Sequence, residues 1–507
     1  MKKDNQKVKA LLLSYLTIAV QIIINIFITP FLIKAMGINE YGLYETINSF
    51  GTTFLVINFG ISAIVSRYIV KYKQKNDKRS LENFLYMSCI ISFCIFILII
   101  LIGVIAINFI PQIYENSLDI SQLDKAKYMF IFIIFNLAIL SWHNFTNGII
   151  IGSERFMFAS ISKLLKQIFK LIIIIFLIIF GVNATSVVIC DLIVTIMIII
   201  IEALYCWLKL HIKIKFYYFD FKMLKKIFSF SIASIIQTIT NQINLSLDKV
   251  ILGVMMTTEI VAKYSVGLLI INVLVTVMQI INGVYLPDAT KLVLQKANGE
   301  TMTNFVIKPS RFQFIIGCLA VFGFLLIGKD FLIIWVGNDF SEIWSSTLII
   351  LIFTTLSYIT SIANVILDAM LKKIYRSLIL IFTAILNVII TICLIPYLGY
   401  FGAALGTGFS LLIGNIILLN IYYKKQIKLK IKYMYLEIFK GILPSAILSF
   451  FISFFIRIFL KNIYLRIAIP VLMFISIFYL LLYFYGFNEN EKILIKKMLK
   501  KFYSHNS

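Results

Sequence analysis

Polar side chains recur at helical spacing within stretches of the chain that are otherwise apolar. The clearest stripe steps by three and four residues along one helical face, through Ser234, Gln237, Asn241, Asn244 and Asp248. Two further stripes have the same period: one consists of Ser14, Thr17, Gln21 and Asn25, and the other of Asn272, Thr276 and Gln279. Such hydroxyls and amides either hydrogen-bond to a neighbouring helix, at about 0.6 kcal/mol per contact, or face water. Three stripes of one kind favour a water-filled central cavity that binds substrate.

Charged side chains within the apolar stretches form a second set of candidates, because a charge inside a bilayer costs on the order of 3 kcal/mol. Asp191 and Glu202 are eleven residues apart, which places them on one helical face about 16 Å apart. They predict a cation or proton route, unless Glu202 lies near the cytoplasmic interface. Asp248 and Lys249 are adjacent and point to different faces, so they act either as interfacial charges or in gating or headgroup binding. The other charged candidates for a gate or a headgroup site are Lys34, Glu45 and Arg67.

A histidine adds a fourth polar stripe. His143 follows Asn136 by seven residues and precedes Asn147 by four, so the three share a helical face. Packing between helices and proton coupling both explain this arrangement. Arg457 is a further charge within an apolar stretch.

These residues lie in fourteen apolar stretches that run almost end to end through the 507 residues. An apolar run of about 18 or more residues can cross the hydrocarbon core as a helix, whereas the strands of a barrel would be short and alternating. With 61% hydrophobic and 14% charged residues, the composition excludes a sizeable water-soluble domain. We predict an all-α polytopic membrane protein with helices over 10–31, 42–65, 83–109, 128–150, 161–181, 186–208, 228–250, 258–286, 312–328, 344–367, 377–398, 400–423, 439–460 and 464–485.

The positive charges alternate between the gaps. Most of the 47 Lys and Arg side chains fall in every second gap, which the positive-inside rule places in the cytoplasm together with both termini. Topology therefore explains the net charge of +24, and we expect no nucleic-acid partner. The sequence has no phosphate-cradling glycine loop and no cluster of metal ligands. We expect neither enzyme activity nor a cofactor nor a metal site, and coupling to H+ or Na+ stays open.

An internal repeat relates the two halves of the chain at an offset near 220 residues. Aligning Tyr44 with Tyr264 also pairs Ser14 with Ser234 and other members of the first two stripes. We predict an N-terminal lobe over 1–210, a C-terminal lobe over 211–425, and two appended helices with a basic cytoplasmic tail over 426–507. Two six-helix units share one orientation, so their symmetry axis lies along the membrane normal, and substrate binds at the interface of such repeats.

Three motifs carry a family resemblance that extends in order over nearly the whole chain. They are Met36-Gly-Ile-Asn-Glu-Tyr-Gly-Leu-Tyr44, Leu247-Asp-Lys-Val-Ile-Leu-Gly253 and Leu394-Ile-Pro-Tyr-Leu-Gly-Tyr-Phe-Gly-Ala-Ala-Leu-Gly-Thr407. The chain resembles the bacterial polysaccharide transport proteins, the O-antigen and repeat-unit flippases of the multidrug/oligosaccharidyl-lipid/polysaccharide exporter superfamily.

This resemblance implies two six-helix lobes in a V around a central cavity, plus two extra C-terminal helices. It also implies that the protein moves an undecaprenyl-diphosphate-linked oligosaccharide from the cytoplasmic to the periplasmic leaflet of the bacterial inner membrane, beside a polysaccharide polymerase machinery. Flippases of this kind line the cavity with cationic residues, whereas the stripes here are amides and hydroxyls. Lys34, Arg67 and Lys249 are then the nearest cationic candidates for the diphosphate.

Other functions fit parts of the pattern. A cation-coupled multidrug exporter of the same superfamily would have twelve helices, so the stretches over 439–460 and 464–485 argue against it. A lipid II flippase shares the helix count, but the Glu40-Tyr-Gly-Leu-Tyr44 opening fits the polysaccharide branch better. A membrane glycosyltransferase or polymerase would need a long extracytoplasmic loop, which the sequence does not offer.

Overall fold

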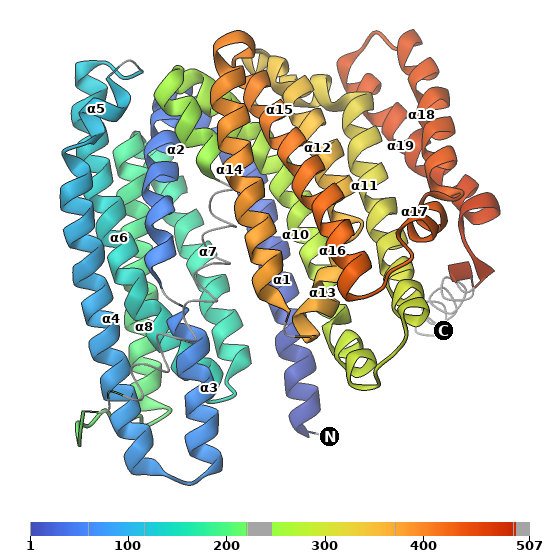
Figure 1. The fold of residues 1–507 in the computed structure, drawn as a ribbon. Coiled ribbons are helices and arrows are strands. Elements are labelled where there is room, and N and C mark those ends of the chain that lie inside the picture. The colour runs from blue at the N-terminus through green and yellow to red at the C-terminus, as the bar shows by residue number, and fades with distance from the viewer. Residues whose placement is uncertain are drawn as a thin grey trace, which may run out of the picture. The chain divides into compact units, whose positions relative to one another are not determined.

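All the regular secondary structure is helical in the residues that the computed structural model describes, which are 2–58, 60–115, 117–219, 221, 246–370, 372–489, 491 and 492 (Figure 1). The chain divides into two compact units, Met1–Ser265 and Val266–Ser507. The predicted division into 1–210, 211–425 and 426–507 stays a prediction, and residues 222–245 of the predicted C-terminal lobe lie outside the described residues.

Unit 1 consists of long helices that pack side by side, with α6 against α3, α4 and α8, and α7 against α1 and α8. Their bounds are α1 Lys2–Met36, α2 Ile38–Thr52, η1 Thr53–Asn58, α3 Ile61–Gln74, α4 Lys78–Ile107, α5 Ile110–Tyr114, α6 Ile120–Gly152, α7 Phe156–Phe180 and α8 Ala184–Leu208. Residues 246–255 are also helical, and α10 (Thr258–Leu294) begins in unit 1 and continues into unit 2.

The second predicted span, 42–65, is wrong as one continuous helix. The chain leaves α1 at Gly37, where φ is +84°, and forms α2, a 3-10 turn and then α3. Gly60 starts α3 with φ of +59°, a left-handed conformation that a residue without a Cβ adopts at little cost. Apolar content alone did not predict this break.

In unit 2, α11 is the central helix, and it packs against α12, α17, α18 and α19. The bounds are α11 Gly299–Trp335, η2 Asn338–Ile343, α12 Trp344–Tyr358, α13 Ser361–Ala369, α14 Lys373–Leu398, α15 Tyr400–Leu411, η3 Leu412–Leu418, α16 Leu419–Gln426, α17 Ile431–Phe439, α18 Ile442–Phe459, α19 Ile463–Leu481 and η4 Leu482–Gly486. The glycine-rich start of α15 packs closely on α14, where Gly402 faces the backbone of Leu394. Close helix packing therefore accounts for these glycines.

Eleven helices within the described residues are long and apolar enough to cross a membrane. They correspond to eleven of the fourteen predicted spans. The other three are the broken span 42–65, the span 161–181, whose helix α7 carries three lysines, and the span 228–250, most of which lies outside the described residues. The chain is therefore a multi-pass membrane protein, and the total of fourteen spans stays a prediction.

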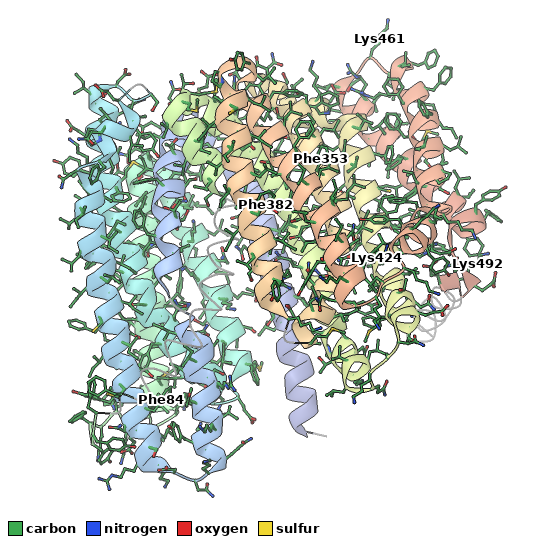
Figure 2. The ribbon with its side chains drawn as sticks, in the orientation of Figure 1. Phe84, Phe353, Phe382, Lys424, Lys461 and Lys492 are labelled. Atoms are coloured by element: carbon green, nitrogen blue, oxygen red, sulfur yellow. The ribbon has the colours of Figure 1, made fainter. Side chains whose placement is uncertain are left out.

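The outward surfaces of the helices are apolar, as a lipid environment requires. On α18, for example, Phe451, Phe455 and Phe459 are each more than 60% exposed. In unit 2, Lys461 lies at one end of the helices and Lys424 and Lys492 lie toward the other, with Phe353 and Phe382 between them (Figure 2). Charges at the ends and aromatic rings between them fit helices that span a bilayer.

Candidate functional site

The Glu40–Tyr44 segment of the first motif holds α2 against α8. Glu40 accepts a hydrogen bond of 3.1 Å from the backbone N–H of Ala184, at the N-terminus of α8 where a carboxylate is favoured. The same carboxylate pairs with Lys125 of α6. The Tyr44 hydroxyl lies 3.5 Å from Asp191. A Cβ on Gly42 would overlap the carbonyl oxygen of Thr258, so the motif also sets the approach of α2 to the start of α10.

Asp248 and Lys249 have separate partners, as their adjacent positions predict. Asp248 is buried and accepts a hydrogen bond of 2.9 Å from the hydroxyl of Tyr264. Lys249 forms an ion pair of 2.8 Å with Glu45 of α2. The structure thus brings together two of the charged candidates, Glu45 and Lys249, and the proposed role of these residues in gating or headgroup binding stays a prediction.

Three lysines of α7 were missed among the charges within predicted spans. Lys163, Lys166 and Lys170 lie in the predicted span 161–181, at spacings of three and four that place them on one face. Lys170 forms an ion pair of 2.6 Å with Asp191 of α8. Lys166 interacts electrostatically with both Asp191 and Glu202. The signal was available in the sequence, since three lysines in one predicted span each need a partner or a ligand.

Glu202 is the centre of a buried polar cluster. Its side chain is 1% exposed and accepts hydrogen bonds from three others: Ser162 on Oε1 at 2.6 Å, and Thr146 and His143 on Oε2 at 2.6 and 3.0 Å. These partners come from α7 and α6, so one carboxylate ties three helices together. Glu202 is therefore buried between the helices, and His143 contacts it directly.

The polar stripes divide between packing and exposure. On α1, Ser14 and Thr17 contact Ser160 of α7, at 2.7 and 3.4 Å, whereas Gln21 and Asn25 are exposed. On α10, Asn272 and Gln279 are exposed. Four amides are thus exposed, of which Gln279 also donates a hydrogen bond of 3.4 Å to the hydroxyl of Tyr358. The two hydroxyls of α1 contact α7.

Several other predicted residues lie elsewhere. Lys34 is exposed in the last turn of α1, and Arg67 is exposed on α3. The stripe over 234–244, which includes Ser234, Gln237, Asn241 and Asn244, lies outside the described residues. Among the residues that the structure does describe, no three His, Cys, Asp or Glu side chains gather as metal ligands would.

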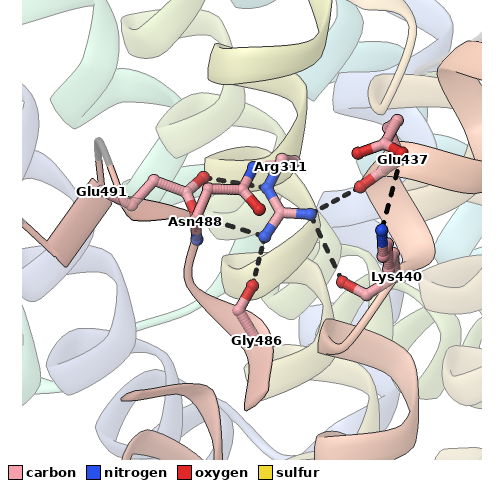
Figure 3. Close-up of polar contacts among 6 residues, drawn as sticks. All are labelled: Arg311, Glu437, Lys440, Gly486, Asn488 and Glu491. Atoms are coloured by element: carbon pink, nitrogen blue, oxygen red, sulfur yellow. Dashed lines mark hydrogen bonds and ion pairs between the residues drawn. The ribbon is translucent and has the colours of Figure 1, made fainter. Parts of the chain in front are cut away.

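In unit 2, ion pairs join α11 to the C-terminal part of the chain at two positions, one nearer each end of the helix. The guanidinium of Arg311 binds both carboxylate oxygens of Glu491, at 2.9 and 3.2 Å, and donates to the backbone carbonyls of Glu437, Lys440 and Gly486 (Figure 3). Toward the other end of α11, Asp330 accepts from Arg457 of α18 and Arg466 of α19 at 2.8 and 3.0 Å. Arg457 therefore has a structural partner.

Between these two ion pairs, one face of α11 packs against the C-terminal helices through apolar contacts. The ring of Phe314 lies 4.8 Å from that of Phe439, and the ring of Phe322 lies 5.8 Å from that of Phe450. The Cys318 side chain is buried in the same cluster as Phe478 and Leu482. We call this face the α11 seam, and it consists of Arg311, Phe314, Cys318, Phe322 and Asp330.

The apolar spans, with ion pairs and exposed amides inside them, are those of a polytopic membrane protein. Residues 7–293 match the model of a family described as polysaccharide biosynthesis protein. This match covers more than half of the 507 residues, and the chain belongs to that family.

Solved structures show the same fold. The chain is similar to the lipid II flippase MurJ in its inward closed conformation, with a TM-score of 0.74 and 16% identity over 93% of this chain and 98% of that one. It is similar to a multidrug resistance MATE family transporter of the MOP superfamily in its inward-facing conformation, with a TM-score of 0.65 and 14% identity over 82% of this chain and 99% of that one. A MOP superfamily transporter from Pyrococcus furiosus gives a TM-score of 0.57 and 14% identity over 83% and 96%. No curated protein sequence matches the chain.

Proposed function

We propose that this protein is a flippase for an undecaprenyl-diphosphate-linked oligosaccharide repeat unit. It moves the lipid from the cytoplasmic to the periplasmic leaflet of the bacterial inner membrane by alternating access. The product then enters the synthesis of a surface polysaccharide such as O-antigen, capsule or exopolysaccharide, beside the polymerase machinery. Both termini lie in the cytoplasm, in keeping with the distribution of Lys and Arg.

The lysine face of α7, in a member of the polysaccharide biosynthesis family, is the observation that carries this proposal. Lys166 and Lys170 follow the start of α7 by ten and fourteen residues, or about 15 and 21 Å along the helix. Cations at that depth are costly without anionic partners, and the three lysines outnumber the two carboxylates beside them, Asp191 and Glu202. Ammonium groups bind phosphate oxygens through strong, charge-assisted hydrogen bonds. Lys163, Lys166 and Lys170 thus supply the cations that a diphosphate needs.

The exposed amides can hydrogen-bond to the sugars of the substrate. Gln21 and Asn25 on α1 and Asn272 and Gln279 on α10 offer both donors and acceptors to sugar hydroxyls. We assign these four residues to the oligosaccharide and the lysines to the diphosphate. The prenyl chain has the solubility of a lipid and stays in the bilayer.

The solved structures behind the two alternative functions differ in how much of this chain they match. The MATE transporter aligns over 99% of its own length with only 82% of this chain, so about a sixth of this chain has no counterpart there. MurJ leaves only 7% of this chain unmatched. A lipid II flippase is therefore the second candidate, since its substrate also carries a diphosphate and an undecaprenyl chain. Both substrates have the same anionic group for the lysines, and the sugars distinguish them.

A deletion strain tests the proposal. We expect loss of surface polysaccharide, with the undecaprenyl-linked precursor retained on the cytoplasmic face. Complementation with Lys166→Gln restores little polymer, whereas Lys209→Gln, which changes an exposed lysine beyond α8, restores it fully. Normal polymer with an unchanged precursor pool contradicts the proposal and directs attention to drug efflux. Lysis of the deletion strain favours the lipid II flippase instead.

A further inference from the structure

The chain leaves α8 through a segment in which basic and apolar residues alternate. Lys209, His211, Lys213 and Lys215 alternate with Leu210, Ile212 and Ile214, and four aromatic residues follow at 216–219. All four basic side chains and all four aromatic ones are exposed. No ion pair joins the three lysines to another residue that the structure describes. We call residues 209–219 the first basic segment.

Contacts with α4 fix the end of this segment. The side-chain oxygen of Asn83, a fully buried residue, accepts hydrogen bonds from the backbone N–H groups of Tyr217 and Tyr218 at 2.9 and 3.1 Å. The Tyr217 hydroxyl donates to Glu82 at 2.7 Å, and the Arg79 guanidinium lies 5.1 Å from the centre of the same ring. The segment is therefore held beside the first turns of α4, at the lower end of that helix in Figure 1.

The first basic segment lies at the level of the lipid headgroups. It follows α8, whose 25 residues are about 37 Å long, whereas the hydrocarbon core of a bilayer is about 30 Å thick. Trp207, in the last turn of α8, is 68% exposed, and tryptophan is enriched where the hydrocarbon meets the headgroups. The lysines that follow Trp207 therefore lie among the phosphate groups of the bilayer.

The same sequence pattern recurs in unit 2. Ile212-Lys213-Ile214-Lys215 has a counterpart in Ile427-Lys428-Leu429-Lys430, which follows the end of α16. There the two lysines are exposed and the two apolar residues are buried, so the lysines point away from the packed helices. Lys430 also lies 3.3 Å from Glu300, in an exposed ion pair. We call residues 427–432 the second basic segment.

A buried polar side chain holds the second segment as well. Thr303 of α11 is 1% exposed, and its hydroxyl accepts a hydrogen bond of 3.1 Å from the backbone N–H of Lys430. Thr303 follows Asn83 by 220 residues, which is the offset of the internal repeat. Gly299 lies so close to the segment that a Cβ there would be 2.5 Å from the carbonyl oxygen of Lys428. Each half of the chain thus fastens a lysine-rich segment to the start of a long helix, and this repetition indicates a common role.

We propose that the two basic segments bind the headgroups of anionic phospholipids, which belong to the surrounding membrane and are distinct from the transported substrate. An ammonium group binds phosphate oxygens through charge-assisted hydrogen bonds, and lysines next to a membrane are attracted to its anionic lipids. Phosphatidylglycerol has a net negative charge, whereas the choline of phosphatidylcholine cancels the charge of its phosphate. The exposed rings of Phe216 and Phe219 favour a lipid over a soluble acidic partner, because aromatic side chains at this level settle among headgroups.

Quenching of tryptophan fluorescence by brominated lipids measures binding at the first segment. Trp142, Trp335 and Trp344 are replaced by phenylalanine, so that Trp207 is the one remaining tryptophan. The protein is reconstituted in phosphatidylcholine vesicles that contain increasing fractions of brominated phosphatidylglycerol or brominated phosphatidylcholine. We expect phosphatidylglycerol to bind beside Trp207 about tenfold more tightly than phosphatidylcholine. The preference should fall in about 1 M salt, because salt screens the charges.

Three variants separate a docked site from general attraction by positive charge. Lys213→Gln/Lys215→Gln should lower the preference for phosphatidylglycerol by about fivefold for each lysine removed. The control Lys75→Gln/Lys78→Gln removes two exposed lysines where α3 leads into α4, and it should keep the preference at Trp207. Asn83→Leu leaves the charge of the protein unchanged but releases the segment from α4, so it should lower the preference as well.

Native mass spectrometry of the protein with all its tryptophans tests the second segment, and it replaces the quenching assay if the tryptophan substitutions prevent folding. Lys428→Gln/Lys430→Gln should retain fewer phosphatidylglycerol molecules than the wild type. If Asn83→Leu does not fold, the lysine variants decide the question.

Several results would overturn the inference. Equal quenching by the two lipids, or an unchanged preference in Lys213→Gln/Lys215→Gln, would show that the first segment binds no anionic lipid. An unchanged preference in folded Asn83→Leu would rule out a site that depends on docking to α4. Loss of the preference in millimolar inorganic phosphate would assign the lysines to soluble anions instead. Because both assays measure lipid binding and not transport, their results are independent of the proposed flippase function.

Discussion

Replacing Arg311 by methionine should loosen the α11 seam at the end where Arg311 binds Glu491. Methionine keeps the length and the apolar stem of the side chain but removes every hydrogen bond of the guanidinium. Arg311 is 1% exposed, so no water replaces it. The Glu491 carboxylate and three backbone carbonyls lose the guanidinium donors, and Glu491 keeps the backbone N–H of Asn488. Removing one partner of a buried ion pair costs about 3–5 kcal/mol. Because Glu491 keeps some contact with water, we expect the lower value, about 3 kcal/mol, or more than 100-fold in the equilibrium for opening the seam.

Cys318 reports that opening directly. It follows Arg311 by two helical turns on the same face, and it is buried against the C-terminal helices. With the other five cysteines replaced, the rate at which a membrane-permeant maleimide labels Cys318 follows the population of the open seam. We expect a rate increase of about 100-fold in Arg311→Met, and a smaller one in Glu491→Gln, which keeps a hydrogen-bonding side chain. Lys492→Gln changes an adjacent surface residue and should leave the rate unchanged. Equal labelling of Arg311→Met and wild type would refute the reasoning.

Three other predictions concern unit 1. Gly42→Ala should lower the free energy of unfolding by about 1–3 kcal/mol, because the new Cβ meets the carbonyl oxygen of Thr258. Thermal unfolding measures this change. The control Gly283→Ala, at a position with open space around it, should be neutral or slightly stabilising. Lys249→Ala and Asp248→Ala should each impair transport without lowering the abundance of the protein in the membrane. Because Glu45 pairs with Lys249, the double variant Glu45→Ala/Lys249→Ala should transport as well as Lys249→Ala alone. Additive losses of transport would show that Glu45 and Lys249 act independently. Asp77 caps α4, and hydrogen bonds from the side chain and backbone of Ser80 lower the pKa of its carboxyl. Since the pKa is lower in the folded state, the cap stabilises the protein above the ordinary aspartate pKa and loses this effect as pH falls through the lowered value. The melting temperature of Asp77→Ala should therefore lie below that of wild type at neutral pH and converge with it in acid.

The spans could be predicted because a long, continuous apolar run in lipid satisfies its backbone hydrogen bonds by forming a helix. The predicted 83–109 and 186–208 coincide to within a few residues with α4 and α8. The break within 42–65 escaped prediction because it depends on backbone conformation at Gly60, where an apolar sequence continues on both sides. Hydropathy depends on the side chains alone and does not report such a change in backbone conformation.

Hydrogen-bond and ion-pair partners that are far apart in the sequence could not be predicted. His143 and Glu202 were both noticed in the sequence, but 59 residues separate them, and nothing local pairs them. Arg311 and Glu491 are 180 residues apart, and Asp330 and Arg457 are 127 apart. The lysines of α7 are different, since their spacing was visible. Sequence reasoning easily assigns lysines in the first half of a predicted span to the membrane interface. The ion pair of Lys170 with Asp191 shows instead that Lys170 takes part in the packing of α7 against α8.

The most direct test of the central claim is the movement of undecaprenyl-diphosphate-linked oligosaccharide across proteoliposomes that contain the purified protein. A membrane-impermeant enzyme that cleaves the sugar from one side measures how much lipid has crossed. The account predicts rapid exchange between leaflets with wild-type protein and a strong reduction with Lys166→Gln. Exchange no faster than in protein-free vesicles, or equal rates for wild type and Lys166→Gln, would contradict it.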